Sequence, residues 1–347
     1  MSDAIDRYHR QTLLPQIGEQ GQHRLARGRV LIAGCGALGC AQADLLARAG
    51  VGLLRLVDRD VVEQTNLQRQ TLYAEKDVGH AKAHAAASRL REINSTINIE
   101  PHATDLTADN AEALAKDCDA IIDGTDNFET RFLLNDVSAK LGIPYVYGGV
   151  IASRGMAATF VPGSTPCLRC IMPEMPPAGA TPTCDTAGVL GPAVAIVAAQ
   201  QAADAMKLLL GRPDLLSNTV LDFDLLANTR RRLHLNEIAG DQTACRCCGQ
   251  RRFDFLDGAH ASSAQMLCGR DAVQVTPSTN DRIELDELAR RLSAVGPCRR
   301  VGPLLKLQTK QNDKQFALTV FPDGRAIVAG TEDPAEARSV YAKVIGA

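Results

Sequence analysis

The chain of 347 residues carries little net charge and has no long apolar run. Its formal net charge is -2 at pH 7, so no overall basic field would attract nucleic acid or anionic lipid. No stretch approaches the roughly 18 consecutive apolar residues of a membrane-spanning helix. The first residues, MSDAIDRYHRQ, contain no apolar signal core. We therefore expect a cytoplasmic protein with neither a membrane nor a nucleic acid as its partner.

The composition is that of an ordinary folded protein with more than one core. Hydrophobic residues make up 45% of the chain and charged residues 22%. A chain of this length exceeds most single hydrophobic cores, so two domains are expected. The composition changes after Gly249, and no internal repeat or low-complexity segment stands out. We predict one domain over residues 1–250 and a small α+β domain over residues 254–347.

The first hundred residues contain the pattern of a mononucleotide-binding unit. The apolar run Arg29–Ala33 ends in glycines, and Leu38–Ala49 then shows helical spacing. A second apolar run, Val51–Val57, ends at Asp58, about twenty residues after the glycines. This order predicts strand, tight turn, helix and strand.

The remaining segments extend this pattern into an α/β fold. Further strands are predicted at Asn98–Pro101, Ala120–Asp123 and Pro144–Gly149. We expect a Rossmann-like, mostly parallel sheet with helices on both faces. The proline-rich Met172–Thr183 predicts a loop or crossover, and Ala187–Gly211 a long buried helix.

Elements of the second domain are predicted from the same signals. Helices are expected at Ile283–Leu292 and from Pro334 onward, and strands at Leu304–Thr309, at Phe316–Phe321 and up to Val328. A PDG turn separates the last two strands. These elements predict a small α+β domain.

Three glycines fit the phosphate-binding pattern G-x-G-x-x-G, namely Gly34, Gly36 and Gly39. They would allow a tight turn, close approach of the backbone to phosphate, and close packing of helix on strand. By itself this pattern favours NAD or FAD, with other nucleotides as the alternative.

Polar residues after the second predicted strand favour a triphosphate. The segment VDRDVVEQTNLQRQ and the helix after it supply Asp58, Asp60, Asn66, Arg69, Gln70 and Lys82. Cations in such a crevice would neutralise the charge of departing pyrophosphate, and NAD has no such leaving group. In DGTDN, Asp126 is placed to hold a magnesium ion, with Asn127 beside it. The alternative for each of these residues is a surface polar group, an Asx-turn or a helix cap.

The motifs RYHRQ, GCGALG, NLQRQ, TDN, CLRC, TCDTAGVLGP, QQAADAMKLLLG and CRCCG follow one another in this order. From about Arg7 to Gly249 the chain thereby resembles the ThiF/MoeB branch of ubiquitin-activating-enzyme-like adenylyltransferases. The resemblance implies ATP-dependent adenylation of the C-terminal glycine of a ubiquitin-like sulfur-carrier protein ending in Gly-Gly. Thiamin, molybdopterin or related sulfur-transfer biosynthesis would use the product. A dehydrogenase is disfavoured.

The resemblance also implies roles for individual residues. Asp58 would bind the ribose hydroxyls, while Asn66, Arg69 and Lys82 would contact the phosphates and Asp126 would coordinate Mg²⁺. Arg10 matches an arginine that reaches into the ATP site of the other subunit, so a homodimer is implied. Ala37 departs from the second glycine that many members have, and we expect it to be tolerated.

The cysteines fall into several classes. Two C-x-x-C pairs predict one structural, tetrahedral zinc site, with reduced core or surface thiols as the alternative. The four ligands would be Cys167, Cys170, Cys245 and Cys248. The pattern C-x-x-C-G selects these over Cys247.

Cys184 follows the proline-rich segment and precedes the long predicted helix, whose N-terminus would favour its thiolate. In the resembled family a cysteine at the matching position is associated with covalent capture of the activated carrier. The alternative is a small residue packed under the helix. Cys35, Cys40 and Cys118 are interpreted as packing residues, and Cys298 supports no interpretation.

The C-terminal domain lacks the active-site cysteine loop expected of a rhodanese. Cys268 could receive sulfur or the carrier, and the alternative is a buried cysteine beside a turn. A docking domain for the carrier or for a sulfur donor is our hypothesis. Two other functions stay open: a non-catalytic nucleotide-binding scaffold, and adenylation of another acceptor such as a peptide, a tRNA base or a ubiquitin-like modifier.

Overall fold

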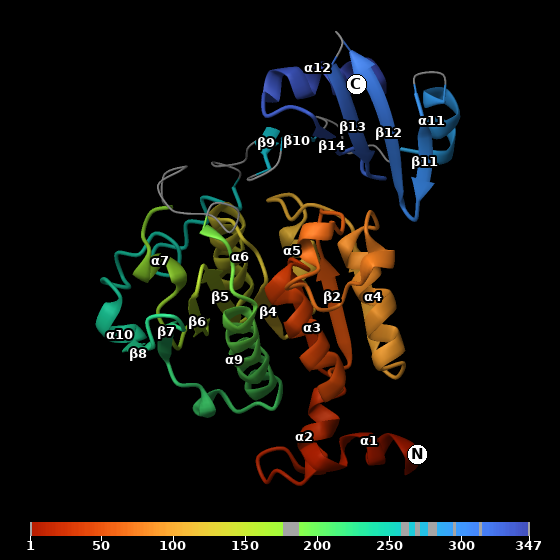
Figure 1. The fold of residues 1–347 in the computed structure, drawn as a ribbon. Helices are drawn as coiled ribbons and strands as arrows, with labels where there is room; N and C mark the ends of the chain where they lie inside the picture. The colour runs from red at the N-terminus through yellow and green to blue at the C-terminus, as the bar shows by residue number, and fades with distance from the viewer. Residues whose placement is uncertain are drawn as a thin grey trace. The chain divides into compact units, whose positions relative to one another are not determined.

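A computed structural model describes residues 2–175, 187–257, 264–267, 271–276, 283–293, 296–311 and 314–345. The chain forms two compact units (Figure 1). The first comprises Met1–Val78 and Lys82–His260, and the second comprises Gly79–Ala81 and Ala261–Ala347. Within the described residues, no helix is both long enough and apolar enough to cross a membrane.

The first unit is built on an eight-stranded sheet with the order β3-β2-β1-β4-β5-β6-β7-β8. The strands are β1 Arg29–Ala33, β2 Leu53–Val57, β3 Asn98–His102, β4 Ala120–Asp123, β5 Tyr145–Ile151, β6 Arg154–Phe160, β7 Thr219–Asp224 and β8 Thr229–His234. The strands β3, β2, β1, β4 and β5 pair in parallel, and β6, β7 and β8 continue the sheet in antiparallel pairs. The predicted α/β fold with a mostly parallel sheet is confirmed, and β6 to β8 are additional.

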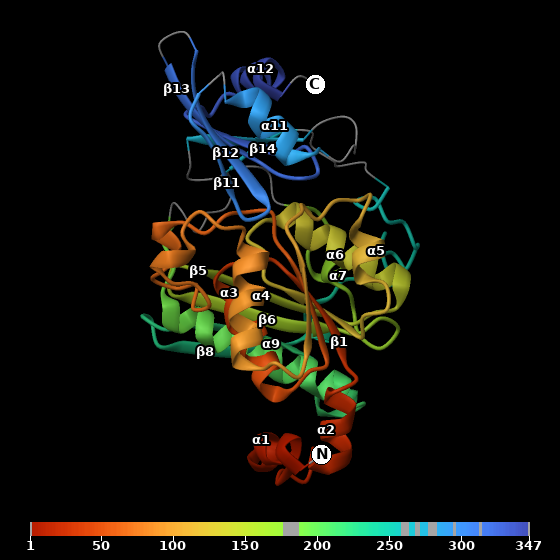
Figure 2. The same ribbon diagram turned by 90° about the vertical axis from the view of Figure 1, so that its right-hand side faces the viewer.

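Helices cover both faces of this sheet (Figures 1 and 2). The described helices of this unit are α1 Ser2–Thr12, α2 Gly18–Leu25, α3 Ala37–Ala49, α4 Lys82–Ile93, α5 Ala111–Ala115, α6 Phe128–Leu141, α7 Leu168–Ile171, α9 Gly191–Leu209 and α10 Leu235–Ile238, of which α1 and α2 lie beyond one end of the sheet. Short 3₁₀ helices lie at Gln64–Asn66, Glu75–Asp77 and Pro213–Leu215. The long buried helix predicted before Gly211 is α9.

Alternate side chains of β1 contribute to two hydrophobic cores, one on each face of the sheet. Val30 and Ile32 belong to a hydrophobic core with residues of α3, α4 and α9. Leu31 and Ala33 belong to a second core with residues of α5 and α6. Successive side chains of a strand point to opposite faces, so a strand that is apolar at every position is buried on both.

The second unit is a six-stranded antiparallel sheet with the order β11-β12-β13-β14-β10-β9. Its elements are β9 Ala264–Met266, β10 Ala272–Val275, α11 Leu285–Leu292, β11 Cys298–Val301, β12 Leu304–Gln311, β13 Lys314–Val320, β14 Ala326–Ala329 and α12 Pro334–Ile345. Apolar residues of α11 and α12 share one core with residues of β10 and β12 to β14. This arrangement is the predicted α+β fold, with β9, β10 and β11 in addition.

Candidate functional site: a nucleotide crevice and a four-cysteine cluster

The glycine turn lies where β1 ends, beside the ends of β2 and β4. Gly34 has a φ of +90°, and its N–H donates to the carbonyl of Val57 over 2.8 Å. A Cβ on Gly34 would lie 2.6 Å from the carbonyl oxygen of Gly124. The turn therefore needs glycine both for its backbone conformation and for the space that β4 leaves.

The other two glycines of the motif differ in what surrounds them. A Cβ on Gly39 would lie 1.9 Å from the carbonyl oxygen of Gly34, whereas one on Gly36 would approach only the Gly124 oxygen, at 3.8 Å. Gly36 precedes α3 with a φ of -76°, which any residue adopts. Gly39 therefore serves helix packing, and Gly36 keeps the start of α3 open.

These distances predict different effects of one added methyl group. Gly39→Ala should lower the free energy of unfolding by about 1–3 kcal/mol or more, because backbone atoms must move. Gly36→Ala should leave the melting temperature unchanged and raise the KM for ATP. Thermal unfolding of both variants and their ATP titrations check this. Equal melting temperatures for the two would contradict it.

Asp58 is held at the end of β2 by two backbone donors. Its two carboxylate oxygens accept hydrogen bonds from the N–H groups of Cys35, at 2.6 Å, and Asp60, at 2.7 Å. Burial is the main cause that raises the pKa of Asp58, and Lys82 opposes it. The carboxylate is fixed beside the glycine turn, in the position from which a Rossmann-type fold contacts a ribose.

Lys82 is the first residue of α4, and its ammonium group lies close to Asp58 and Asp60. Its Nζ lies 3.0 Å from a carboxylate oxygen of Asp60, and the residue is 4% exposed. The hydroxyl of Tyr73 donates to the carbonyl of Cys35, at 2.8 Å, and also lies 3.2 Å from the carbonyl of Lys82. Tyr73 thus ties the lysine to the glycine turn, a role that sequence analysis did not predict.

The NLQRQ segment contains one cation and three amides. Asn66 is buried, and its side-chain oxygen accepts from the N–H of Glu63 over 3.0 Å. The half-buried Arg69 donates to the carbonyl of Thr65 at 3.0 Å and has no ion pair among the described residues. Gln70 is buried, and no described residue hydrogen-bonds its side-chain oxygen. Asn66 holds the local turn, while the charge of Arg69 is not neutralised by a carboxylate within the described part of the chain.

Asp126 and Asn127, at the end of the DGTDN loop, have different surroundings. Asp126 is exposed, whereas Asn127 caps α6 by accepting the N–H of Thr130 over 2.9 Å. The side-chain oxygen of Asn127 therefore has the helix-cap role that the sequence left as the alternative. The Asp126 carboxylate lies after the carboxyl end of β4 and makes no hydrogen bond with the described residues.

A buried polar network that the sequence analysis missed fixes this loop. Asp123 is fully buried, accepts the Tyr145 hydroxyl at 2.9 Å, and lies 3.3 Å from the Nε of Arg131. Arg131 also donates to the Thr125 carbonyl at 2.8 Å and stacks over the Tyr147 ring. Its partners come from separate elements, so no local pattern in the sequence indicates them.

Arg10 does not reach this crevice in its own chain. It is exposed on α1, whose Tyr8 accepts a hydrogen bond from Asn94, just beyond the end of α4. A Cβ on Gly50, at the end of α3, would also touch the Tyr8 ring. Since α3 and α4 begin at the crevice, α1 lies at their far ends (Figure 1).

The cysteines outside the C-x-x-C pairs differ in their burial. Cys35, Cys40 and Cys118 are buried. Burial raises the pKa of Cys40 to about 12 and that of Cys118 to about 11, so both stay protonated thiols at neutral pH. Cys184 lies outside the described residues, as does Cys268 of the second unit. Cys298 is half-buried.

Four cysteines from two distant segments of the chain lie close together. The sulfur atoms of Cys167, Cys170, Cys245 and Cys248 all lie within 4.8 Å of one another. Three separations are 3.8 Å for Cys167–Cys170, 3.7 Å for Cys167–Cys245 and 3.3 Å for Cys170–Cys248. Tetrahedral Zn–S bonds of about 2.3 Å require sulfur atoms about 3.8 Å apart. The cluster therefore fits a four-thiolate zinc ion.

Buried side chains brace both cysteine pairs. Asn135 of α6 accepts the N–H of Leu168 at 2.9 Å and donates to the sulfur of Cys247 at 3.2 Å. Arg169, between the first two cysteines, pairs with Asp254 at 3.1 Å. Cys247 thus contacts α6 and also Cys167, whereas the sulfur atoms of the other four cysteines form the cluster.

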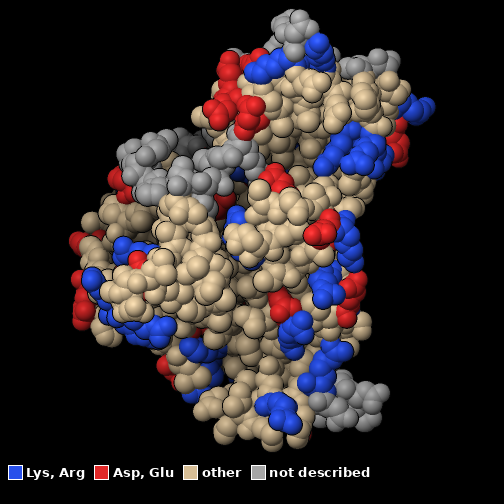
Figure 3. Space-filling model, viewed as in Figure 1, with Lys and Arg blue, Asp and Glu red and all other residues tan. Residues whose placement is uncertain are grey.

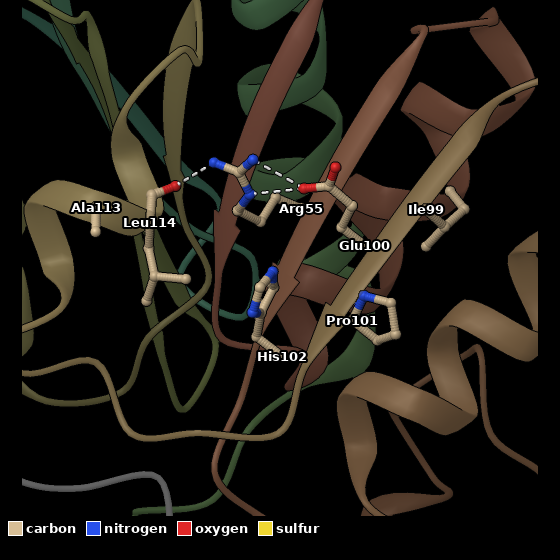
Figure 4. Close-up of a pocket in the computed structure, with 7 residues that line it drawn as sticks. All are labelled: Arg55, Ile99, Glu100, Pro101, His102, Ala113 and Leu114. Atoms are coloured by element: carbon tan, nitrogen blue, oxygen red, sulfur yellow. Dashed lines mark hydrogen bonds and ion pairs between the residues drawn. The ribbon is translucent and has the colours of Figure 1, made fainter. Parts of the chain in front are cut away.

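A separate hollow of about 590 Å³ lies beside β2, β3 and α5 (Figure 4). Its lining residues are Arg55, Ile99, Glu100, Pro101, His102, Ala113 and Leu114. The Arg55 guanidinium already binds Glu100 at 2.8 Å and the Leu114 carbonyl at 2.7 Å. Burial and Arg55 lower the pKa of His102, which favours its neutral form. The arginine here is structural.

The chain is similar to proteins of known activity. It is 44% identical to the sulfur carrier protein ThiS adenylyltransferase of Bacillus subtilis (strain 168), covering 98% of this chain and 99% of that one. It is 40% identical to the sulfur carrier protein adenylyltransferase of Thermus thermophilus, covering 71% of this chain and 92% of that protein.

The fold also matches solved structures. The crystal structure of E. coli MccB with succinimide aligns with a TM-score of 0.59 and 25% identity, covering 70% of this chain and 74% of that chain. The ThiF family model matches residues 8–247, which contain the glycine turn, Lys82, Asp126 and three of the four clustered cysteines, with Cys248 directly after them. The chain therefore belongs to the ThiF family.

Proposed function

We propose that this protein adenylates the C-terminal glycine of a ubiquitin-like sulfur-carrier protein with ATP and releases pyrophosphate. The placement of Asp58 and Lys82 beside the glycine turn carries the proposal, because it joins a ribose acceptor to a cation suited to a triphosphate, and Arg69 in the NLQRQ segment would supply a second cation. The similarity to a ThiS adenylyltransferase over nearly its whole length supports the same acceptor. Thiamin, molybdopterin or a related sulfur-transfer biosynthesis would use the product.

The reaction requires positioning and charge neutralisation more than proton transfer. A carboxylate oxygen of the terminal glycine forms a bond to the α-phosphorus, and the bond from that phosphorus to the bridging oxygen breaks. The electron pair leaves with pyrophosphate. The attacking carboxylate is already ionised, so no general base is needed. Lys82 and Arg69 offset the charge that grows on the leaving group.

Two metals accompany this proposal. Asp126 offers an exposed oxygen ligand of the kind that Mg²⁺ prefers, and Mg²⁺ there would neutralise the phosphate oxygens of bound ATP. Zinc would bind the sulfur atoms of Cys167, Cys170, Cys245 and Cys248. With all four positions taken by protein ligands, it would be structural.

Pyrophosphate–ATP exchange tests the function. Each Gly-Gly-ending ubiquitin-like protein of the same genome is added in turn, with a form lacking its last glycine as control. Exchange that requires the intact terminus is the expected result. A protein that binds ATP but exchanges with no carrier would instead be a nucleotide-binding scaffold or would act on a different acceptor.

We propose that two chains form the working unit, with Arg10 of each completing the crevice of the other. Neither Arg10→Ala nor Lys82→Ala should exchange pyrophosphate alone. In an equal mixture after subunit exchange, half the dimers would be mixed and would hold one intact site, giving roughly a quarter of wild-type activity. No recovery in a mixture that has exchanged subunits would contradict the shared site.

A further inference from the structure

The last strand of the large sheet is an exposed, basic edge. β8 pairs with β7 on one side, and no described strand pairs with its other side. All six residues of β8 are exposed, and they include Arg230, Arg231 and Arg232 in succession. Figure 3 shows Lys and Arg side chains gathered on the flank where Figure 1 places β7, β8 and α10.

The charge of these three arginines is not neutralised within the described part of the chain. None of them has an ion pair or a hydrogen-bonded side chain there, and two carboxylates of the neighbouring strand β7 are already engaged. Asp222 accepts two hydrogen bonds from Arg154, both at 2.8 Å. Asp224 accepts from the Ser153 hydroxyl at 2.8 Å. The edge therefore keeps a surplus of positive charge.

Apolar side chains accompany this charge. Leu226, just before β8, is 77% exposed, and Leu233 within it is 42% exposed. Charged residues alone are a common protection of an edge strand against aggregation. Exposed leucines add nothing to such protection, whereas arginine together with apolar surface is the composition of a binding interface.

The edge is also continuous with the nucleotide crevice. Thr229 pairs with Asp224, Asp224 with Arg154, and Arg154 with Ile151 at the carboxyl end of β5. The start of β8 thus lies at the same end of the sheet as the crevice. From β4 to β8 there are four strand spacings, about 19 Å in all. An extended tail of about six residues spans this distance.

We propose that the β8 edge, defined by Arg230, Arg231, Arg232 and the neighbouring Leu226 and Leu233, docks an acidic face of the folded sulfur carrier. The inference rests on the proposed function, since it supplies the partner whose tail must enter the crevice. Arginine binds carboxylates through its planar fork, and the leucines would cover apolar surface at the contact. Docking here lets the terminal glycine reach the end of β4.

A matched pair of charge reversals tests the docking surface. Arg230→Glu with Arg232→Glu is compared with Arg27→Glu and Lys116→Glu, two exposed cations, one between α2 and β1 and one directly after α5, that change the net charge equally. Pyrophosphate exchange is measured against the concentration of the ThiS-type carrier from the same genome. The β8 variant should raise the KM for the carrier about tenfold, with kcat and the KM for ATP unchanged. The control should match wild type.

Three further measurements separate the outcomes. Added salt should raise the carrier KM of wild type more than that of the β8 variant, and lysines at carrier acidic positions should restore binding to the variant. If the charge-reversal variant does not fold, the milder variant Arg230→Gln with Arg232→Gln takes its place. If wild type is active and the β8 variant has the same KM for the carrier as wild type, this inference alone is overturned. Wild type that exchanges with no carrier overturns the proposed function and this docking role together.

Discussion

Asp126→Ala is expected to lower pyrophosphate exchange about a thousandfold or more without changing the melting temperature. Its carboxylate is exposed and makes no hydrogen bond with the described residues, so its removal disturbs no packing. Loss of the proposed Mg²⁺ ligand would remove charge stabilisation where the triphosphate breaks, and single groups of this kind contribute about 10²–10³-fold or more. Steady-state exchange and thermal unfolding of the same preparation measure both effects.

Lys82→Ala provides the contrasting variant. It should lose activity equally, but it also leaves Asp60 without the ammonium group that lies 3.0 Å away, so the melting temperature should fall. Adding Asp60→Asn should recover part of that stability and none of the activity. Exchange by Asp126→Ala at the wild-type rate would remove this carboxylate from the proposed machinery.

Replacing Cys170 by serine should remove the zinc and lower the melting temperature by on the order of 10 °C or more. The cluster joins the segment around α7 to a segment more than seventy residues later, so its loss frees both. Cys247→Ser is the matched control, because that sulfur contacts Asn135 and Cys167 without being one of the four clustered sulfur atoms. Atomic absorption should find one zinc per chain in wild type and in the control, and none in Cys170→Ser. Full zinc content in Cys170→Ser would contradict the assigned ligands.

Most of the parallel half of the fold was predictable because β1, β2 and β4 are largely apolar and are each followed by a distinctive residue, whereas β3, with the sequence NIEPH, is mostly polar. Gly34 follows β1 and Asp58 follows β2, and the glycine pattern indicated the turn between β1 and α3. The antiparallel extension was not predictable in the same way. β8 has the sequence TRRRLH and is exposed along its whole length, so it shows no alternation of apolar and polar residues.

Two parts of the candidate site were predictable from the sequence: the residues that directly follow strands, and the cysteines that are spaced as C-x-x-C pairs. Lys82 and Asp58 reach the same crevice because β2 ends and α4 begins at neighbouring points of the sheet. Tyr73 and Arg131 were missed because their partners are backbone carbonyls and side chains distant in sequence. Asn127 shows the limit of a motif, since its side-chain oxygen caps α6.

Intact-mass spectrometry of the carrier tests the central claim most directly. The protein is mixed with ATP, Mg²⁺ and the ThiS-type carrier, and the mass of the carrier is recorded before the acyl-adenylate hydrolyses. We predict a carrier heavier by one adenylyl group, absent when the last glycine is removed or when Asp126→Ala replaces wild type. An unmodified carrier, or an adenylyl group that persists without the terminal glycine, would contradict adenylation of that carboxylate.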